Sequence, residues 1–261
     1  MMSLLPPRLL LLLAWLFAGA AWGEIPAPTK INPRLVIAVH EWRPFASRDA
    51  HYFGLLPRIA ARVLETQGVT PEFRFMPWPE ALDGLVTEEY DAALIWVMED
   101  LDRRYFLFSE PVLELRGALY YQAKRPRPRT PDDLLGFSIG INPAYVYDAP
   151  SFQLMKSRAM IPVKGGNDRE NFDLLLKGDI DFYLSPLLSS TPLLRNSYSG
   201  EQRQRLAYTT EIFKFPPVHL LVNQQRPGSK ELLEKFNNSL KRLQNDGTLD
   251  RYLDDMRFDK Y

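Results

Sequence analysis

Short apolar segments alternate with amphipathic segments, and this alternation is the feature that most limits how the chain can fold. Residues 35–39 (LVIAV) form a continuous β-branched apolar run, which is typical of a strand buried in a parallel sheet. In residues 55–64 the apolar side chains recur at helical spacing. The series continues with a strand at 73–75, a helix at 78–86 and a strand at 92–97. This order predicts an α/β sheet with right-handed crossovers.

The same pattern restarts after a break in composition. Residues 124–129 (KRPRPR) are basic and proline-rich, which predicts a linker and not a core segment. Beyond it we expect a strand at 137–141, a helix at 168–177, a strand at 180–184, a strand at 218–222 after the pair Pro216–Pro217, and an amphipathic helix pair over 230–256. The chain therefore contains two α/β units with crossings near Gln122 and Pro216.

The N-terminus has the order of a secretory signal peptide. Arg8 precedes an apolar run over residues 9–21, and residues 21–23 (AWG) have the small-x-small form of a cleavage site. The alternative is a membrane-spanning helix, which needs roughly 20 apolar residues and is therefore longer than this run. We expect export into a bacterial periplasm with removal of residues 1–23.

Charge and residue content exclude several functional classes. Cleavage removes one of 32 basic residues and none of 32 acidic ones, which leaves a net charge of −1. A near-neutral chain predicts no nucleic-acid partner and no anionic membrane surface. No Cys is present, so neither a disulfide nor a lipid on a cysteine can form. Three scattered histidines form no metal-ligand pattern and no nucleotide-binding motif occurs, so we expect neither a metal nor a cofactor.

Five segments resemble, in order and spacing, the extracellular solute-binding proteins of family 3, the amino-acid type of periplasmic receptors. They are WRPF at 42–45, GL through YDAA at 84–93, FSEP at 108–111, LLLKGDID at 174–181 and LKRLQNDGTL at 240–249. The resemblance implies the two-lobed periplasmic-binding-protein-like fold (type II), with two hinge strands and a ligand cleft between the lobes. Residues 24–121 and 218–261 would form the first lobe, and residues 122–217, with the hinge crossings, the second.

The resemblance also implies a function. The chain would capture a small polar, amino-acid-like ligand as a monomer and deliver it to a membrane transporter of the ABC type or to a sensor. The alternative is a periplasmic dehydratase of the cyclohexadienyl type on the same fold, since some relatives catalyse elimination. That chemistry needs a general acid or base in the cleft, for which Glu41 is the candidate.

Three ligand positions depart from what the resemblance implies. The family usually clamps an α-carboxylate with an Arg seven residues before Ser109, where this chain has Asp102; Arg103 can serve if the loop is shifted by one residue, and is otherwise a solvated arginine. Residues 144–145 (AY) stand where the family has Gly-Thr, and Pro186 stands near its acidic residue. These departures predict weak binding of ordinary free α-amino acids.

Aromatic residues are the other candidates for ligand contact. Trp42 follows one expected strand and Trp96 ends another, which favours the cleft, whereas Phe53 and Trp78 have core packing as their alternative. Together with Tyr145, these rings could stack a planar or cationic group, at about 0.5–2 kcal/mol for each cation–π contact.

Two polar residues complete the candidate set. Glu41 could hold a ligand ammonium or be a solvated loop carboxylate. Asn167 follows two glycines and precedes a helix, so it is expected to cap that helix, which does not exclude a ligand contact.

Overall fold

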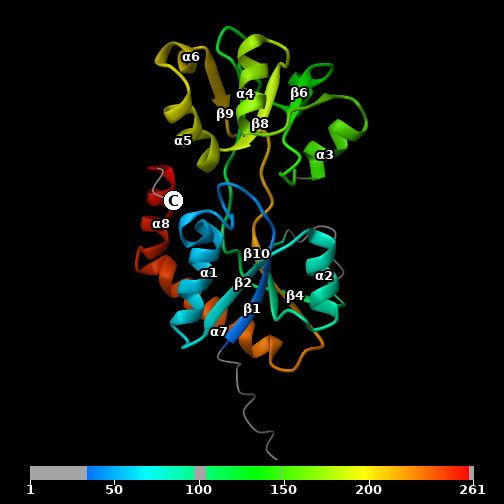
Figure 1. The fold of residues 1–261 in the computed structure, drawn as a ribbon. Coiled ribbons are helices and arrows are strands. Elements are labelled where there is room, and N and C mark those ends of the chain that lie inside the picture. Colours follow the sequence, from blue (N-terminus) through cyan, green and yellow to red (C-terminus); the bar gives the residue numbers. More distant parts are fainter. Residues whose placement is uncertain (1–33, 97–103, 148, 259–261) are drawn as a thin grey trace, which may run out of the picture. The chain divides into compact units, whose positions relative to one another are not determined.

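The computed structural model describes residues 34–96, 104–147 and 149–258 and builds them around two five-stranded sheets (Figure 1). The first sheet has the order β2-β1-β3-β10-β4 and contains β1 (Arg34–Val39), β2 (Thr70–Phe75), β3 (Ala92–Trp96), β4 (Phe106–Phe108) and β10 (His219–Asn223). The second has the order β7-β6-β8-β5-β9 and contains β5 (Gly117–Gln122), β6 (Ser138–Ile141), β7 (Ile161–Lys164), β8 (Phe182–Pro186) and β9 (Leu206–Thr209).

The two sheets share one strand pattern. In the first, β1 pairs in parallel with β2 and β3, and β10 is antiparallel to β3 and β4. In the second, β6 pairs in parallel with β7 and β8, and β5 is antiparallel to β8 and β9. β10 joins the first sheet although it follows the strands of the second, and β5 joins the second sheet although it directly follows β4 of the first. The chain therefore passes twice between the sheets.

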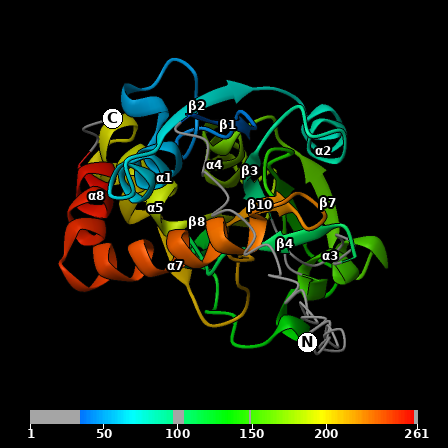
Figure 2. The same ribbon diagram turned by 90° about the horizontal axis from the view of Figure 1, so that it is seen from below.

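Helices cover both faces of the first sheet. They are α1 (Leu55–Glu65), α2 (Trp78–Val86), α7 (Ser229–Asn245) and α8 (Thr248–Arg257). The apolar sides of α1 and α7 share one buried cluster with β1 and β10, whereas α2 packs on the opposite face around Leu85 and Tyr90. Figure 2 shows α1, α7 and α8 together on one side of the strands and α2 on the other. The C-terminal helices therefore pack on the sheet that contains β1.

The second sheet is covered by α3 (Ala149–Lys156), α4 (Asp168–Lys177), α5 (Leu187–Ser197) and α6 (Gly200–Gln204). Phe172 of α4 and Tyr183 of β8 are fully buried and centre a separate cluster on one face. Asn171 lies against Gly165 so closely that a Cβ there would come within 2.6 Å of several of its side-chain atoms. This packing holds the loop between β7 and α4 against the sheet.

Two crossings join the sheets and run side by side. Residues 109–116 lead from β4 to β5, and residues 210–218 lead from β9 to β10. The amide of Val112 donates to the carbonyl of Val218 at 2.7 Å, and the amide of Val218 donates to Leu113 at 2.9 Å. The first crossing thus lies before β5, whereas the sequence placed it near Gln122, which is the last residue of β5 in the second sheet.

The proline-rich segment at 124–129 accounts for that displacement. It follows β5 and packs on the second sheet, where the Arg125 guanidinium lies 4.6 Å from the Phe137 ring centre and pairs with Asp181, and Arg127 pairs with Glu211 at 2.9 Å. Its composition excludes it from a core, but this does not distinguish a surface turn within one lobe from a linker between two.

The expected signal peptide at 1–23 lies outside the described residues. Among the residues that are described, no helix combines the length and the apolar character that crossing a bilayer requires.

Candidate functional site

Loops that follow the carboxyl ends of parallel strands line a cavity of about 520 Å³. Residues 41–44 follow β1, residues 142–144 follow β6 and residues 166–169 follow β7, while α5 and Met256 of α8 close the remaining side. Parallel sheets place polar loops at this edge, which is where ligands bind in open α/β folds. The cavity is lined by segments of both sheets: Glu41, Arg43, Pro44, Asn142, Ala144, Gly166, Asn167, Asp168, Arg169, Ser189, Pro192, Leu193, Asn196, Ser197 and Met256.

A smaller, ring-lined cavity lies beside it. Its volume is about 30 Å³, and its lining consists of His40, Trp42, Trp78, Leu115, Ala144, Val146, Phe215 and Pro216. His40 stacks on Trp78 with ring centres 5.6 Å apart. Ala144 lines both cavities, so the aromatic cavity and the polar one meet at this residue.

Trp42 connects the two lobes through ring contacts. It is 8% exposed, lies 4.7 Å from Phe45 of its own loop, and meets the edge of Tyr145 at 6.3 Å. Its indole Nε1 is buried without a hydrogen-bond partner in the described structure. A buried donor that lacks an acceptor is costly and rare in native proteins, so this N–H marks a place where a ligand acceptor would be stabilising.

The centre of the polar cavity is a carboxylate that the sequence did not single out. Asp168, the first residue of α4, accepts hydrogen bonds from Asn142 Nδ2 at 2.8 Å, from the Tyr145 hydroxyl at 2.6 Å and from the Tyr183 hydroxyl. Ser185 Oγ lies 3.5 Å from its second oxygen. These donors come from β8 and from the loop after β6, so the site is assembled from three segments that are distant in sequence.

The tyrosines of this network stay protonated over a wide pH range. Burial raises the pKa of Tyr145 well above its usual value, and the negative charge of Asp168 raises it further. The pKa of Tyr183 is raised by the same two causes in the same order. Both hydroxyls therefore remain donors, and they keep the carboxylate of Asp168 in one orientation.

The first-lobe side of the cavity carries ion pairs instead. Arg43 lies 3.5 Å from Glu41 and 2.6 Å from Asp49, and Arg48 lies 3.9 Å from Glu41. These side chains are between 38% and 68% exposed. The carboxylate of Glu41 thus lines the cavity but is already close to two arginines.

Asn167 caps the helix, as the sequence predicts. Its side chain accepts from the amide of Glu170 at 3.0 Å and its Nδ2 donates to the Glu170 carboxylate. It also lines the polar cavity, so the capping role and a place in the wall of the site coexist.

The structure gathers part of the predicted set. Glu41 and Asn167 line the polar cavity and Trp42 and Trp78 line the aromatic one, whereas Tyr145 is in neither lining but contacts Trp42 and Asp168. Phe53 is 43% exposed and packs against Phe73 and Phe75, so it belongs to neither lining. Trp96 is the last residue of β3 and pairs through its backbone with His219, and Arg103 lies outside the described residues.

Asp168, Asn142 and Ser189 are the residues that sequence reasoning missed. Asp168 directly follows the predicted cap, and Asn142 directly follows the strand expected at 137–141, so proximity to a strand end was the available signal. Nothing local distinguishes them from solvated loop residues. No cluster of three potential metal-ligating side chains occurs within the described residues.

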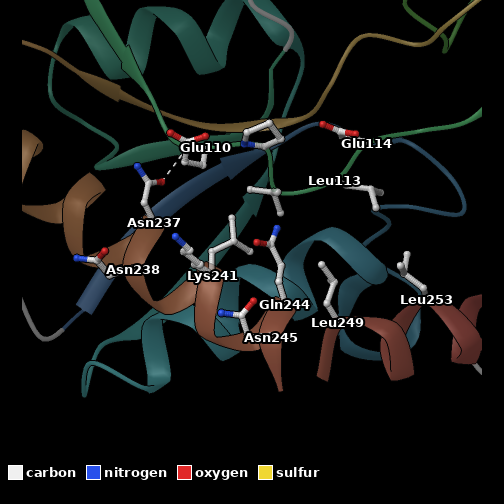
Figure 3. A pocket seen from close by; sticks show the side chains of 13 residues that line it. Glu110, Leu113, Glu114, Asn237, Asn238, Lys241, Gln244, Asn245, Leu249 and Leu253 are labelled. Carbon is white, nitrogen blue, oxygen red and sulfur yellow. Dashed lines mark hydrogen bonds between the residues drawn. The ribbon is translucent and has the colours of Figure 1, made fainter. Parts of the chain in front are cut away.

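A further hollow of about 730 Å³ lies between α7, α8 and the segment after β4 (Figure 3). Asn237 of α7 accepts there from the amide of Glu110 at 2.8 Å, and Lys241 and Gln244 face the same space. All of its lining comes from elements of the first lobe and the segment that leaves it. A ligand there would contact one lobe only. We therefore take the cavity of about 520 Å³, which loops of both sheets line, as the candidate functional site.

The two sheets and their flanking helices form the two-lobed fold of the type II periplasmic binding proteins. The family model of bacterial extracellular solute-binding proteins, family 3, matches residues 35–256. The chain belongs to this family, and it has a solute-binding role. No curated protein sequence matches the chain.

Solved structures of low sequence identity share the fold. The second substrate-binding domain of GlnP from Lactococcus lactis, in its open conformation, is 17% identical with a TM-score of 0.63, over 87% of this chain and 96% of that one. An ancestral arginine-binding protein bound to arginine is 19% identical with a TM-score of 0.64, over 86% and 98%. The VFT2 domain of BvgS from Bordetella pertussis is 17% identical with a TM-score of 0.64, over 86% and 94%.

Proposed function

We propose that this chain is a periplasmic receptor that encloses one small polar solute in the cavity around Asp168 and passes it, as a monomer, to a membrane transporter or a sensor. The observation that carries the proposal is that the strand-end loops of both sheets line one polar cavity, which adjoins an aromatic one at Ala144. Hinged lobes that close on a ligand need such a two-sided site.

The proposed lobes follow the sheets. Residues 34–108 and 219–258 form the first lobe and residues 117–209 the second, with the two crossings as the hinge. In this arrangement the polar part of the solute lies among Asn142, Asn167 and Ser189, and its flat or apolar part lies toward Trp42 and Trp78. Because the positions that the family uses for an α-amino acid are altered, we propose a ligand other than a simple free α-amino acid.

The test is a thermal-shift screen of a metabolite library on protein purified after export. A solute that binds only the folded form raises stability by about 2.7 kcal/mol at a hundredfold excess over its dissociation constant. Trp78→Ala should weaken any hit by at least tenfold, whereas Tyr208→Ala, at an exposed ring on the edge strand β9, should leave it unchanged.

Two outcomes would contradict the proposal. One is the absence of any stabilising solute from a broad library. The other is a hit whose affinity is insensitive to Trp78→Ala, which would place the ligand elsewhere. Incubation with prephenate-like substrates, followed by product analysis, tests the dehydratase alternative in the same preparation, and turnover would assign catalysis to the site.

A further inference from the structure

The carboxylate of Asp168 has polar neighbours but no opposite charge. Among the described residues, no Lys, Arg or His nitrogen lies within 4.0 Å of it. Its firm partners are an amide and two hydroxyls, which are neutral. Neutral donors orient a carboxylate and lower the cost of its partial burial, but they leave its net charge in place.

These contacts leave one lone-pair direction of the Asp168 carboxylate without a close donor. A carboxylate offers about four lone-pair directions. One oxygen of Asp168 accepts from Asn142 and Tyr183, and the other accepts from Tyr145. The fourth neighbour, Ser185 Oγ, is at 3.5 Å, the limit of a hydrogen bond. Since Asp168 lines the cavity of about 520 Å³, this direction is available to a bound group.

The two arginines in the cavity wall, Arg43 and Arg169, contact other side chains. Arg43 lies between Glu41 and Asp49. Arg169 is exposed and donates to Ser197 Oγ at 2.7 Å. Neither guanidinium forms an ion pair with Asp168, so the negative charge of this carboxylate at the cavity wall is not balanced by an ion pair. An incoming ammonium or guanidinium would complete the carboxylate's coordination and neutralise its charge.

Asp168 also lies near the end of β8, where the residues differ from those that the family resemblance implies. Ser185 and Pro186 end β8, where the resemblance implies an acidic residue that this chain lacks. The Asp168 side chain reaches the same strand end from the N-terminus of α4, through Tyr183 and Ser185. An acidic group therefore lies within 3.5 Å of Ser185, the residue before Pro186, although it comes from a different segment of the chain.

We infer that Asp168 is the acceptor for a cationic nitrogen of the ligand, so that the solute class is amines or guanidines and not anions or neutral sugars. The inference rests on the proposed function, because it assigns a ligand group to that same cavity. Asp168 would set specificity by its charge, and the tyrosines would act as positioning residues that hold it toward the cavity.

The experiment compares matched probes on the exported wild-type protein by isothermal titration. Phenethylammonium, 2-phenylethanol and 3-phenylpropionate share a ring and differ in the charge of their polar end, and butylammonium, 1-butanol and pentanoate repeat the comparison without a ring. We expect each ammonium to bind at least tenfold more tightly than its neutral and anionic counterparts. This comparison needs no variant, so it does not depend on the folding of a mutant.

The second arm uses Asp168→Asn, which keeps the shape and removes the charge, with Asp179→Asn as a control at an exposed position of the same lobe. We expect Asp168→Asn to lose at least tenfold in ammonium affinity and Asp179→Asn to lose none. Equal or tighter binding of the carboxylate probes, or undiminished ammonium binding by Asp168→Asn, would overturn the inference while leaving a solute site in place. Absence of binding by every probe and every library solute would overturn both proposals.

Discussion

The two sheets have the same strand order, yet the loops at their carboxyl ends are built differently. On the first lobe, Arg43, Glu41 and Asp49 form exposed ion pairs above a buried Trp42. On the second, Asp168 is held by hydroxyls and an amide that are themselves buried. Exposed ion pairs contribute little to stability and rearrange easily, whereas satisfied buried networks impose one geometry. If the proposed function holds, we expect the second lobe to determine ligand chemistry and the first to adapt when the lobes close.

Removal of the Asp168 carboxylate should cause the largest loss of stability among the changes that test this difference between the lobes. Asp168→Ala leaves the donors of Asn142, Tyr145 and Tyr183 without their acceptor, and an orphaned buried donor costs about 1–3 kcal/mol. Because Tyr145 can turn to Ser189, 3.0 Å away, and cavity water can reach Asn142, we expect a total loss of roughly 2–5 kcal/mol. Urea denaturation of the ligand-free protein measures it.

The matched control for this substitution is Asp49→Ala, which removes a carboxylate from the first-lobe loop. We expect a much smaller change in the urea midpoint, since the Asp49 side chain is 68% exposed. Equal losses for the two variants would show that the network around Asp168 is no more stabilising than an exposed ion pair, and the comparison would fail.

The backbone elements of both lobes follow from local patterns to different degrees. The strand at 35–39 and the helices at 55–64, 78–86 and 168–177 are close to β1, α1, α2 and α4. Local patterns do not predict β4, β5, β7, β9, α3, α5 or α6. Pro192 interrupts the helical pattern of α5, and β5 and β9 are specified by pairing with each other and with β8. Such long-range pairing leaves little trace in a local window.

The site was less predictable than the fold, for a related reason. Trp42 and Asn167 could be selected because a residue just after a strand or just before a helix has a local signature. Asp168 has the same kind of position, but its importance comes from Asn142 and Tyr183, which lie 26 and 15 residues away in sequence. Charge compensation is a three-dimensional property, so a single sequence cannot show that this carboxylate lacks a cation.

Alkaline pH should produce the next largest change in the free energy of unfolding. Burial, followed by the charge of Asp168, raises the pKa of Tyr145 and of Tyr183 above the value near 10 of the unfolded chain. The native state then retains protons that the unfolded state has lost, so these tyrosines leave stability unchanged below about pH 10 and reduce it as pH rises further. The slope is at most about 1.4 kcal/mol per pH unit for each tyrosine.

Urea midpoints from pH 8 to pH 11 for wild type and Tyr183→Phe measure this dependence. We expect the variant to lose stability less steeply above pH 10, and Tyr208→Phe, at an exposed position, to follow the wild-type slope. A Tyr183→Phe curve parallel to wild type through the alkaline range would mean that the Tyr183 hydroxyl is not held protonated by its surroundings.

The smallest effect on stability should come from the ion pairs of the first-lobe loop. The strength of these pairs determines how easily the loop can rearrange. Arg43→Ala removes both ion pairs, but the Arg43 side chain is 62% exposed and its partners are 38% and 68% exposed. Such pairs are typically worth about 0.2–1 kcal/mol and weaken as salt screens them. A double-mutant cycle of Arg43→Ala with Asp49→Ala, at low and high salt, should therefore give a coupling energy below about 1 kcal/mol that declines with salt. The corresponding cycle of Asp168→Ala with Tyr183→Phe should give a larger coupling that salt hardly changes, because Tyr183 is fully buried. If the Arg43 cycle were the stronger and the less sensitive to salt, the first-lobe loop would be the rigid half of the site, and the assignment of ligand chemistry to the second lobe would have to be reversed.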